Sequence, residues 1–303
     1  MAYDVLIVGG GPAGLSAALA LGRGRKSVLL CDAGPPRNAA ATHMQNFVSR
    51  DGTPPTEFRA MARAQLERYP NVEVRDARIE EIRGEHGNFN ARLASGDVQA
   101  RRVLLCAGMI DELPELDGFR TFWGTSVFQC PYCHGWEHRD RRFGVLASSI
   151  EMLEHALFIR GWSKDVVGFT DARYTVPPEL RTHLARARLR VEERRVTGLS
   201  GDGTRLEQIE LEGGASVPLD VLFVRPAQRQ VPIVQALGVM LDDKGYVQVD
   251  ALSQETSIPG IYAGGDLIMQ FQAAVLAAAS GTRAAASLNH ALTVELAKSG
   301  ALP

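Results

Sequence analysis

Short continuous apolar runs alternate with helix-like segments along much of the chain. Residues 5–8 and 103–106 are apolar throughout, and residues 27–31 are apolar after Ser27, a pattern typical of strands buried on both faces of a parallel sheet. An alanine- and leucine-rich segment from residue 12 to about residue 22 separates the first two runs and has the composition of a helix. This alternation of strand and helix predicts an α/β fold.

The same pattern begins again near the middle of the chain. It predicts a strand at 143–146, a helix at 150–160 and a strand at 166–169. Further elements are then expected, in chain order, as strands at 72–75, 77–82, 89–93, 98–100, 190–193, 208–211 and 221–224, and as helices at 56–68, 179–187 and from residue 274 to about residue 290. A chain of 303 residues with two such patterns is expected to form two domains.

Composition and charge exclude several classes of protein. The formal net charge of −2 provides no basic field, so we expect no nucleic-acid partner. No apolar run approaches the ~20 residues that span a bilayer, and the N-terminus enters a strand without a basic leader, so we expect no membrane partner and a cytoplasmic location. Four cysteines in that compartment are poor evidence for a structural disulfide framework.

A glycine-rich turn follows the first strand. Gly9-x-Gly11-x-x-Gly14 stands between strand and helix, and Asp32 ends the next apolar run about 20 residues later. Glycines in such a turn let the backbone approach a pyrophosphate at the helix N-terminus, while the acid binds a ribose hydroxyl. The spacing therefore predicts a dinucleotide site.

A C-x-x-C lies near the middle of the chain. Cys130 and Cys133 are followed by His134, and the spacing suits either thiol–disulfide exchange or zinc. Zinc is disfavoured because the ligand set completed by His138 lies within nine residues and adjacent Cys133 and His134 can hardly face one ion, so we predict no metal. Pro131 suits the first turn of a helix, whose N-terminus would lower the pKa of Cys130.

The residues around the dithiol have competing interpretations. His134 is a candidate general acid or base, with a histidine bonded to the backbone as the alternative, and Glu137 is a weak candidate to orient it. Trp136 is expected in the core, with a stacking platform for a second ring system as the alternative. Cys31 and Cys106 end apolar runs and are predicted to be buried hydrophobes.

A third motif lies near the C-terminus, where Thr256-Ser-Ile-Pro-Gly-Ile-Tyr-Ala-Gly-Gly-Asp266 precedes the last helix. With these three motifs in this order, the chain resembles the low-molecular-weight thioredoxin reductase family of flavoproteins. The resemblance implies two Rossmann-like three-layer domains, with an FAD-binding domain formed by residues 1–115 and 228–303 and a central dithiol domain of residues 116–227 inserted into it. It also implies a homodimer.

The resemblance assigns roles to individual residues. The glycine turn would line the FAD pyrophosphate and Asp32 the adenosine ribose, Asn46 would approach the flavin, Asp266 would meet the ribityl chain and Gln272-Ala273 the isoalloxazine edge. Cys133 would lie next to the flavin, while Cys130 exchanges with the substrate. The full predicted cofactor set is Gly9, Gly11, Pro12, Ala13, Gly14, Asp32, Ala33, Arg37, Asn38, Asn46, Ala107, Gly108, Gly265, Asp266, Gln272 and Ala273.

The chain departs from the family at three places. In the central domain Ala147, Ser149 and Met152 stand where a glycine-rich NADPH turn is expected, and Asp171 stands in the segment that binds the 2′-phosphate. The third departure is His134, which replaces the aspartate that follows the family's C-x-x-C. These changes argue against NADPH as the cofactor.

The string C-P-Y-C-H-G-W-E is similar to gliotoxin- and holomycin-type dithiol oxidases and to thioredoxin reductase-like enzymes independent of pyridine nucleotides. We therefore predict an FAD-dependent thiol/disulfide oxidoreductase that acts on a thioredoxin-like protein or a small dithiol. Ferredoxin or a second FAD would be its electron donor, or oxygen its acceptor. An NAD(P)H-dependent thioredoxin-disulfide reductase and a non-catalytic redox sensor are the alternatives.

Overall fold

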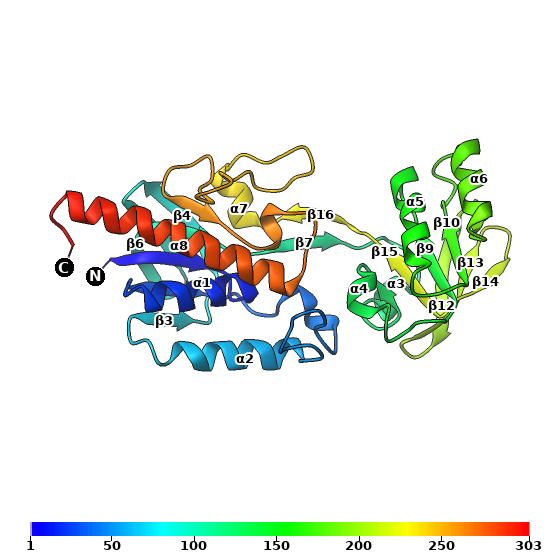
Figure 1. The fold of residues 1–303 in the computed structure, drawn as a ribbon, viewed down its shortest axis with the longest axis horizontal. Helices are drawn as coiled ribbons and strands as arrows, with labels where there is room; N and C mark the ends of the chain where they lie inside the picture. Colours follow the sequence, from blue (N-terminus) through cyan, green and yellow to red (C-terminus); the bar gives the residue numbers. More distant parts are fainter. Residues whose placement is uncertain (1, 303) are drawn as a thin grey trace. The chain divides into compact units, whose positions relative to one another are not determined.

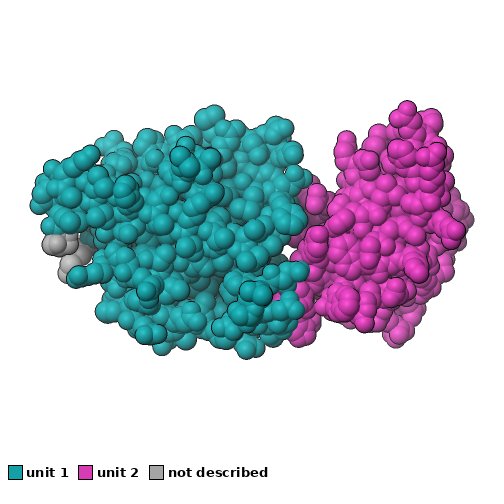
Figure 2. All heavy atoms as spheres, viewed as in Figure 1, with its two compact units in different colours: residues 1–39, 46–110, 228–303 teal, residues 40–45, 111–227 magenta. Residues whose placement is uncertain are grey.

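The computed structural model describes residues 2–302, which divide into two compact units (Figure 2). Unit 1 contains residues 1–39, 46–110 and 228–303, and unit 2 contains residues 40–45 and 111–227. Segments from both halves of the chain belong to unit 1, so unit 2 is largely an insertion within unit 1. The strand β7 (Met109–Glu112) before the insertion pairs with β16 (Ala227–Gln230) after it.

Unit 1 is built on a seven-stranded sheet (Figure 1). Its order is β3-β2-β1-β6-β5-β4, with β17 also paired to β6. The pairs among β1, β2, β3, β6 and β17 are parallel, and those among β4, β5 and β6 are antiparallel. The strands are β1 (Tyr3–Val8), β2 (Val28–Cys31), β3 (Val72–Arg75), β4 (Ile79–Glu85), β5 (Asn88–Leu93), β6 (Gly96–Leu105) and β17 (Ile261–Ala263).

The two faces of this sheet are covered differently. Val5 and Ile7 belong to a core cluster with α1, α2 and α8, whereas Leu6 and Val8 pack with β4, β5 and α7. Figure 1 shows α1 and α8 along the same face. The helices of unit 1 are α1 (Pro12–Arg23), α2 (Pro55–Leu66), α7 (Pro232–Leu237) and α8 (Ala274–Lys298), with 3-10 turns η1 (Arg37–Ala40) and η2 (Asp266–Ile268).

Unit 2 repeats this plan on a smaller scale. A five-stranded sheet of order β11-β10-β9-β15-β8 is parallel throughout, with α5 and α6 packed on one face and the antiparallel sheet β12-β13-β14 on the other. Its elements are α3 (Phe119–Phe122), β8 (Val127–Phe128), α4 (Pro131–His134), β9 (Phe143–Leu146), α5 (Ile150–Ile159), β10 (Val166–Phe169), α6 (Pro178–Arg186), β11 (Arg190–Glu192), β12 (Val196–Asp202), β13 (Arg205–Leu211), β14 (Ser216–Pro218) and β15 (Val221–Val224). The predicted α/β class with parallel sheets is confirmed.

Some predicted boundaries were wrong. The strands predicted at 98–100 and 103–106 form one strand, β6. Arg102 lies within it, is buried, and donates to the backbone of Arg101 and to Glu295 of α8, so its charge does not interrupt the strand. The two adjacent arginines, Arg101 and Arg102, interrupt the apolar pattern and so led to the prediction of two separate strands. The strands β7, β8, β12, β14 and β16 were missed, and α8 extends beyond residue 290 to Lys298.

Candidate active site

The predicted cofactor residues of unit 1 gather at one edge of its sheet. Gly9 follows β1, Asp32 follows β2, Ala107 and Gly108 follow β6, and Gly265 follows β17. These four strands are parallel, so their carboxyl ends meet at the same edge. Ligands of open α/β sheets bind in the crevice outside the carboxyl ends of the strands.

The three motif glycines of the β1–α1 turn, Gly9, Gly11 and Gly14, differ in the space around them. A Cβ at Gly9 would overlap the carbonyl of Cys106, and a Cβ at Gly14 would overlap the carbonyl of Gly9, so both positions need glycine for close packing. A Cβ at Gly11, in contrast, would meet nothing within 4 Å. Gly11 is also the N-cap of α1, no side chain caps that end, and Pro12 and Ala13 begin the helix. The turn therefore leaves the helix N-terminus open to an anion.

Asp32 is a buried carboxylate with two arginine partners. It is 6% exposed and accepts hydrogen bonds from Arg59 and, at 2.7 Å, from Arg63, both on α2. Arg59 also donates to the carbonyl oxygens of Gly10, at 3.3 Å, and Gly34, at 3.2 Å. Sequence reasoning missed these arginines, because their spacing is that of an ordinary helix face and nothing in it points to Asp32.

A second polar cluster joins three predicted residues to two that the sequence did not reveal. Arg37 donates to Asp266, at 3.2 Å, and to the side-chain oxygen of Gln272. Gln272 and Gln228 are bonded to each other through their amides, at 3.0 and 3.1 Å. The hydroxyl of Tyr246 donates to Gln228 at 3.1 Å. Gln228 and Tyr246 lie outside the recognised motifs, which explains why they were missed.

The remaining predicted residues lie outside the strands, in loops, in the 3-10 turn η1 or at the N-terminus of α8. Asn46 has a positive φ of 61° and donates its N–H to Asp51 at 2.8 Å. The N–H of Gly265 donates to Ser280 of α8 at 2.6 Å, and Ala273 is the N-cap of α8. Exposed members of the set are Ala33, Asn38 and Asn46.

In unit 2 the two C-x-x-C cysteines form a disulfide. Cys130 and Cys133 are bonded with a Cα–Cα distance of 5.3 Å, and both are partly exposed. Cys130 is the N-cap of the one-turn helix α4, and Pro131 occupies its first turn as predicted. The N–H of Cys133 donates to the carbonyl of Cys130 at 3.2 Å. The turn thus holds the two sulfur atoms together on a short, exposed element.

His134 stacks on the buried ring of Phe128, with centroids 4.0 Å apart and planes 9° from parallel. Burial and the neighbouring His138 lower the pKa of His134 to about 4, against a backbone hydrogen bond to Cys130 that raises it. Its Nδ1 is buried without a hydrogen-bond partner in the described chain. His134 is therefore neutral near pH 7. Glu137 raises the pKa of the neighbouring His138.

The prediction that Trp136 lies in the core was wrong. Its side chain is 64% exposed and lies under the guanidinium of Arg139, 4.2 Å from the ring centroid. The helix α4 ends at His134 and Gly135 packs against Trp162, which leaves Trp136 directed outward. Cys31 and Cys106 are buried free thiols, as predicted.

In the β9–α5 turn of unit 2, side chains of unit 2 already bond to the N–H and carbonyl groups at the helix end. The hydroxyl of Ser149 accepts the N–H of Met152 at 3.2 Å and so caps α5. The hydroxyl of Tyr174 donates to the carbonyls of Ala147, at 3.2 Å, and Ser149, at 2.8 Å. Glu151 lies in the first turn of α5, and its pKa is lowered mainly by a hydrogen bond from Ser149. An anion approaching this helix end meets a capped N–H and a carboxylate.

Asp171, the other departure in unit 2, is already engaged. It accepts the N–H of Val196 at 2.8 Å and pairs with Arg173 at 3.0 Å. Its φ of 55° places the backbone in the left-handed region, where a short polar side chain bonding locally is tolerated. The carboxylate therefore has a local structural role.

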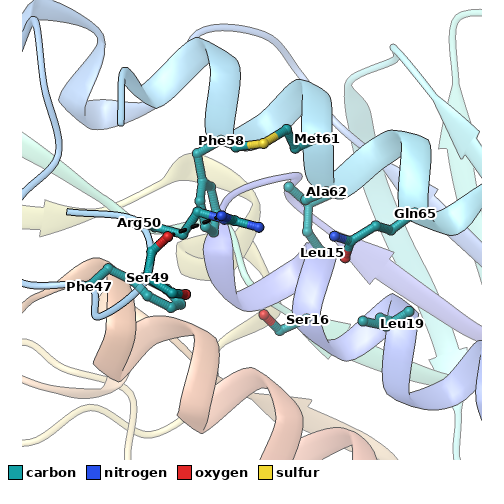
Figure 3. A pocket seen from close by; sticks show the side chains of 10 residues that line it. All are labelled: Leu15, Ser16, Leu19, Phe47, Ser49, Arg50, Phe58, Met61, Ala62 and Gln65. Atoms are coloured by element: carbon teal, nitrogen blue, oxygen red, sulfur yellow. Dashed lines mark hydrogen bonds between the residues drawn. The ribbon is translucent and has the colours of Figure 1, made fainter. Parts of the chain in front are cut away.

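A hollow lies between α1 and α2 in unit 1 (Figure 3). Its volume is about 200 Å³, and the rings of Phe47 and Phe58 are 5.5 Å apart. Arg50 donates to the carbonyl of Ser49 at 3.0 Å. The lining residues are Leu15, Ser16, Leu19, Phe47, Ser49, Arg50, Phe58, Met61, Ala62 and Gln65, and no predicted cofactor residue is among them.

Residues 2–302 contain neither a metal cluster nor a membrane-spanning helix. No group of three or more histidine, cysteine, aspartate or glutamate side chains in that range could hold a metal ion. None of the helices described is both long and apolar enough to cross a membrane.

Comparison with known proteins places this architecture. Residues 3–281 match the family described as pyridine nucleotide-disulphide oxidoreductase. The chain is 32% identical to thioredoxin reductase tcpT of Claviceps purpurea, over 87% of this chain and 86% of that protein. Among solved structures it resembles HlmI, with a TM-score of 0.92, 36% identity and coverage of 99% of this chain and 95% of that one. An oxidoreductase from Agrobacterium tumefaciens gives a TM-score of 0.90 and 37% identity, covering 96% of this chain and 99% of that one.

Proposed function

Because the chain belongs to the pyridine nucleotide-disulphide oxidoreductase family, and is a thioredoxin reductase-like disulfide oxidoreductase within it, we propose that Cys130 and Cys133 are its redox-active pair. Proteins of this thioredoxin reductase-like family are FAD flavoproteins. The observation that carries the proposal is the disulfide itself, held on an exposed turn beside a neutral histidine with an unpartnered nitrogen.

The sheet edge of unit 1 fits FAD. Open space beside Gly11 and the uncapped N-terminus of α1 suit a pyrophosphate. Asp32 suits a ribose hydroxyl, and Asp266 and Gln272 supply polar groups for the ribityl chain and the flavin ring. FAD, when bound, would supply a two-electron redox partner for the cysteine pair. We accordingly propose unit 1 as the FAD domain and unit 2 as the dithiol domain.

The exchange step follows from the chemistry of the dithiol. A substrate thiolate attacks Sγ of Cys130, a mixed disulfide forms, and the thiolate of Cys133 leaves. The second substrate thiol then attacks the mixed disulfide, which releases oxidised substrate and leaves both cysteines reduced. His134 is the proposed acid/base of the exchange: it takes the proton that a substrate thiol loses as it becomes the attacking thiolate, and its lowered pKa keeps it neutral at the start. In the opposite direction the same groups reduce a substrate disulfide.

We further propose that NADPH does not drive turnover. The pyrophosphate position of unit 2 is opposed by Ser149, which caps α5, and by Glu151 in its first turn. Tyr174 holds the carbonyls of that turn in place. Electrons would come from ferredoxin or a second flavin, or would pass to oxygen if the enzyme forms disulfides.

The remaining proposals concern the substrate, the oligomeric state and the cellular location. A thioredoxin-like protein or a small dithiol is the proposed substrate, and a homodimer the proposed assembly. Free buried thiols at Cys31 and Cys106 are compatible with a reducing compartment, and we propose the cytoplasm.

Anaerobic absorbance spectroscopy tests the redox assignment. Dithiothreitol should bleach the flavin band of the purified protein, and Cys133→Ser should abolish the bleaching while retaining bound FAD. NADPH at the same concentration should leave the band unchanged over minutes. Rapid bleaching by NADPH would overturn the donor proposal, and bleaching by dithiothreitol that survives in both Cys130→Ser and Cys133→Ser would overturn the assignment of the pair.

A further inference from the structure

The strand that returns from unit 2 to unit 1 carries two glutamines on one face. Gln228 and Gln230 are two residues apart in β16, and side chains two apart on a strand point to the same side. The main chain of β16 pairs with β7, so these side chains are not needed to hold the strand in its sheet. Both amides instead bond to segments that flank Asp266 and Gln272.

Gln228 forms a reciprocal pair with Gln272. The Nε2 of Gln228 donates to Oε1 of Gln272 at 3.1 Å, and Nε2 of Gln272 donates to Oε1 of Gln228 at 3.0 Å. Tyr246 donates a further hydrogen bond to Oε1 of Gln228 at 3.1 Å. A paired amide that also accepts from a hydroxyl has one orientation, because its exchange of oxygen and nitrogen would oppose donor to donor.

The remaining bonds of Gln272 agree with that orientation. Its Oε1 also accepts from Arg37, and its Nε2 also donates to the carbonyls of Asp266 and Met269, each at 3.2 Å. Every donor and acceptor of the amide is thus assigned by its neighbours. Gln230, which is 2% exposed, donates to the carbonyls of Gly245, at 2.9 Å, and Leu267, at 3.1 Å, and so ties the same strand to the turn that holds Asp266.

We propose that Gln228, supported by Tyr246, is a positioning residue that fixes the amide of Gln272 at the flavin edge and thereby sets the redox equilibrium of bound FAD. The inference rests on the proposed FAD site of unit 1. Hydrogen bonds in a partly buried network strengthen one another, and an amide that has lost its partner is free to turn its dipole. A dipole beside a redox group changes the relative stability of its oxidised and reduced forms.

Three variants test this on the FAD-loaded protein. Gln228→Leu removes both bonds to Gln272, Tyr246→Phe removes only the hydroxyl that orients Gln228, and Gln248→Leu is a matched control at an exposed glutamine of the same unit. The measurements are the midpoint potential of bound flavin, by anaerobic equilibration with a reference dye, the FAD dissociation constant, and the melting temperature of the apoprotein.

We expect Gln228→Leu to change the equilibrium between oxidised and reduced flavin about tenfold, which for a two-electron couple is about 30 mV. Tyr246→Phe should shift the potential in the same direction by a smaller amount, and Gln248→Leu should leave it unchanged. Wild-type potential in both Gln228→Leu and Tyr246→Phe would overturn the inference. If Gln228→Leu fails to fold or bind FAD, wild-type potential in Tyr246→Phe would do the same, whereas wild-type protein without FAD would overturn the proposed function instead.

Discussion

The chain contains two strand-to-helix turns of the same topology with opposite chemistry. The β1–α1 turn of unit 1 leaves the N-terminus of its helix uncapped, with no acid in the first turn and open space beside Gly11. The β9–α5 turn of unit 2 caps its helix with Ser149, carries Glu151 in the first turn and is bonded through its carbonyls to Tyr174.

The contrast separates what the fold requires from what a ligand requires. Both turns join a buried parallel strand to a helix that packs on the same sheet, and both are compatible with a complete core. The βαβ architecture is held by apolar packing, so it survives when the helix end no longer accepts an anion. Only the polar groups at the helix end distinguish a turn suited to a pyrophosphate from one that is closed to it.

The largest effect is expected from giving the open turn a carboxylate. Gly11→Asp places a negative charge beside the proposed pyrophosphate, and such a like-charge contact costs several kcal/mol, so FAD affinity should fall by about 100-fold or more. Since a Cβ at Gly11 meets no neighbour, the melting temperature of the apoprotein should change by only about 2 °C. Flavin fluorescence titration measures the affinity, with Gly11→Ala as the uncharged control. Equal affinity in Gly11→Asp and Gly11→Ala would contradict the comparison.

Acid should destabilise unit 2 through His134, a group without counterpart at the open turn. The pKa of His134 is lowered to about 4 in the folded protein, so the unfolded chain binds the extra proton between about pH 6.5 and 4. The free energy of unfolding is therefore unaffected by His134 above pH 6.5. As the pH falls below that value, protonation of the unfolded chain lowers the free energy of unfolding by roughly 2–3 kcal/mol. Urea unfolding from pH 7.5 to 4.5 should show a shallower loss in His134→Gln than in the wild type.

The control for that experiment is His43→Gln, which removes an exposed histidine of a loop. His138 and His155 have pKa values lowered in the same direction, and they remain in both proteins. The difference between the curves therefore reports His134 together with its coupling to His138. Parallel curves for the wild type and His134→Gln would show that the histidine is not held neutral.

Opening the closed turn should have a more modest effect. The double variant Ser149→Gly, Glu151→Gln removes the cap and the carboxylate from α5, and we expect NADPH-dependent flavin bleaching to become about tenfold faster than in the wild type. Stopped-flow absorbance measures the rate, with Glu154→Gln as a control at an exposed acid of the same helix. An unchanged rate would assign the exclusion of NADPH to other residues, such as Asp171.

The smallest effect is expected at Tyr174, whose hydroxyl bonds to the carbonyls of the β9–α5 turn. Tyr174→Phe removes the donor to the carbonyls of Ala147 and Ser149 and should lower the free energy of unfolding by about 1 kcal/mol. Burial raises the pKa of Tyr174 to about 12, so the effect should persist across the neutral range. FAD affinity should be unchanged, because the tyrosine belongs to unit 2. Urea unfolding and flavin titration of the same preparation check both statements.

Local patterns were sufficient for the elements and motifs that depend on short-range rules. Apolar runs identified β1, β2, β9 and β10, because a strand buried on both faces needs no polar alternation. The departures at Ala147 and Ser149 were visible because a glycine turn has a fixed spacing. The sequence could not show that Tyr174, 25 residues away from Ser149, would close that turn.

Longer-range partners explain most of what was missed. Arg102 interrupted the apolar pattern of β6, and only its pairing with Glu295, 193 residues later, makes its burial understandable. Gln228 is joined to Gln272 across 44 residues, and neither spacing nor composition marks it. Trp136 was misplaced because its exposure depends on where a one-turn helix ends, and element ends are the least certain part of a sequence pattern.

The burial of Cys31 and Cys106 has a practical consequence. Burial raises the pKa of both thiols, that of Cys31 to about 11, so neither forms the reactive thiolate at neutral pH. All four cysteines of the chain are thereby sorted into two shielded and two accessible ones. An alkylating mass tag applied to the native protein would therefore report the state of the Cys130/Cys133 pair, with two tags where the pair is reduced and none where it is a disulfide.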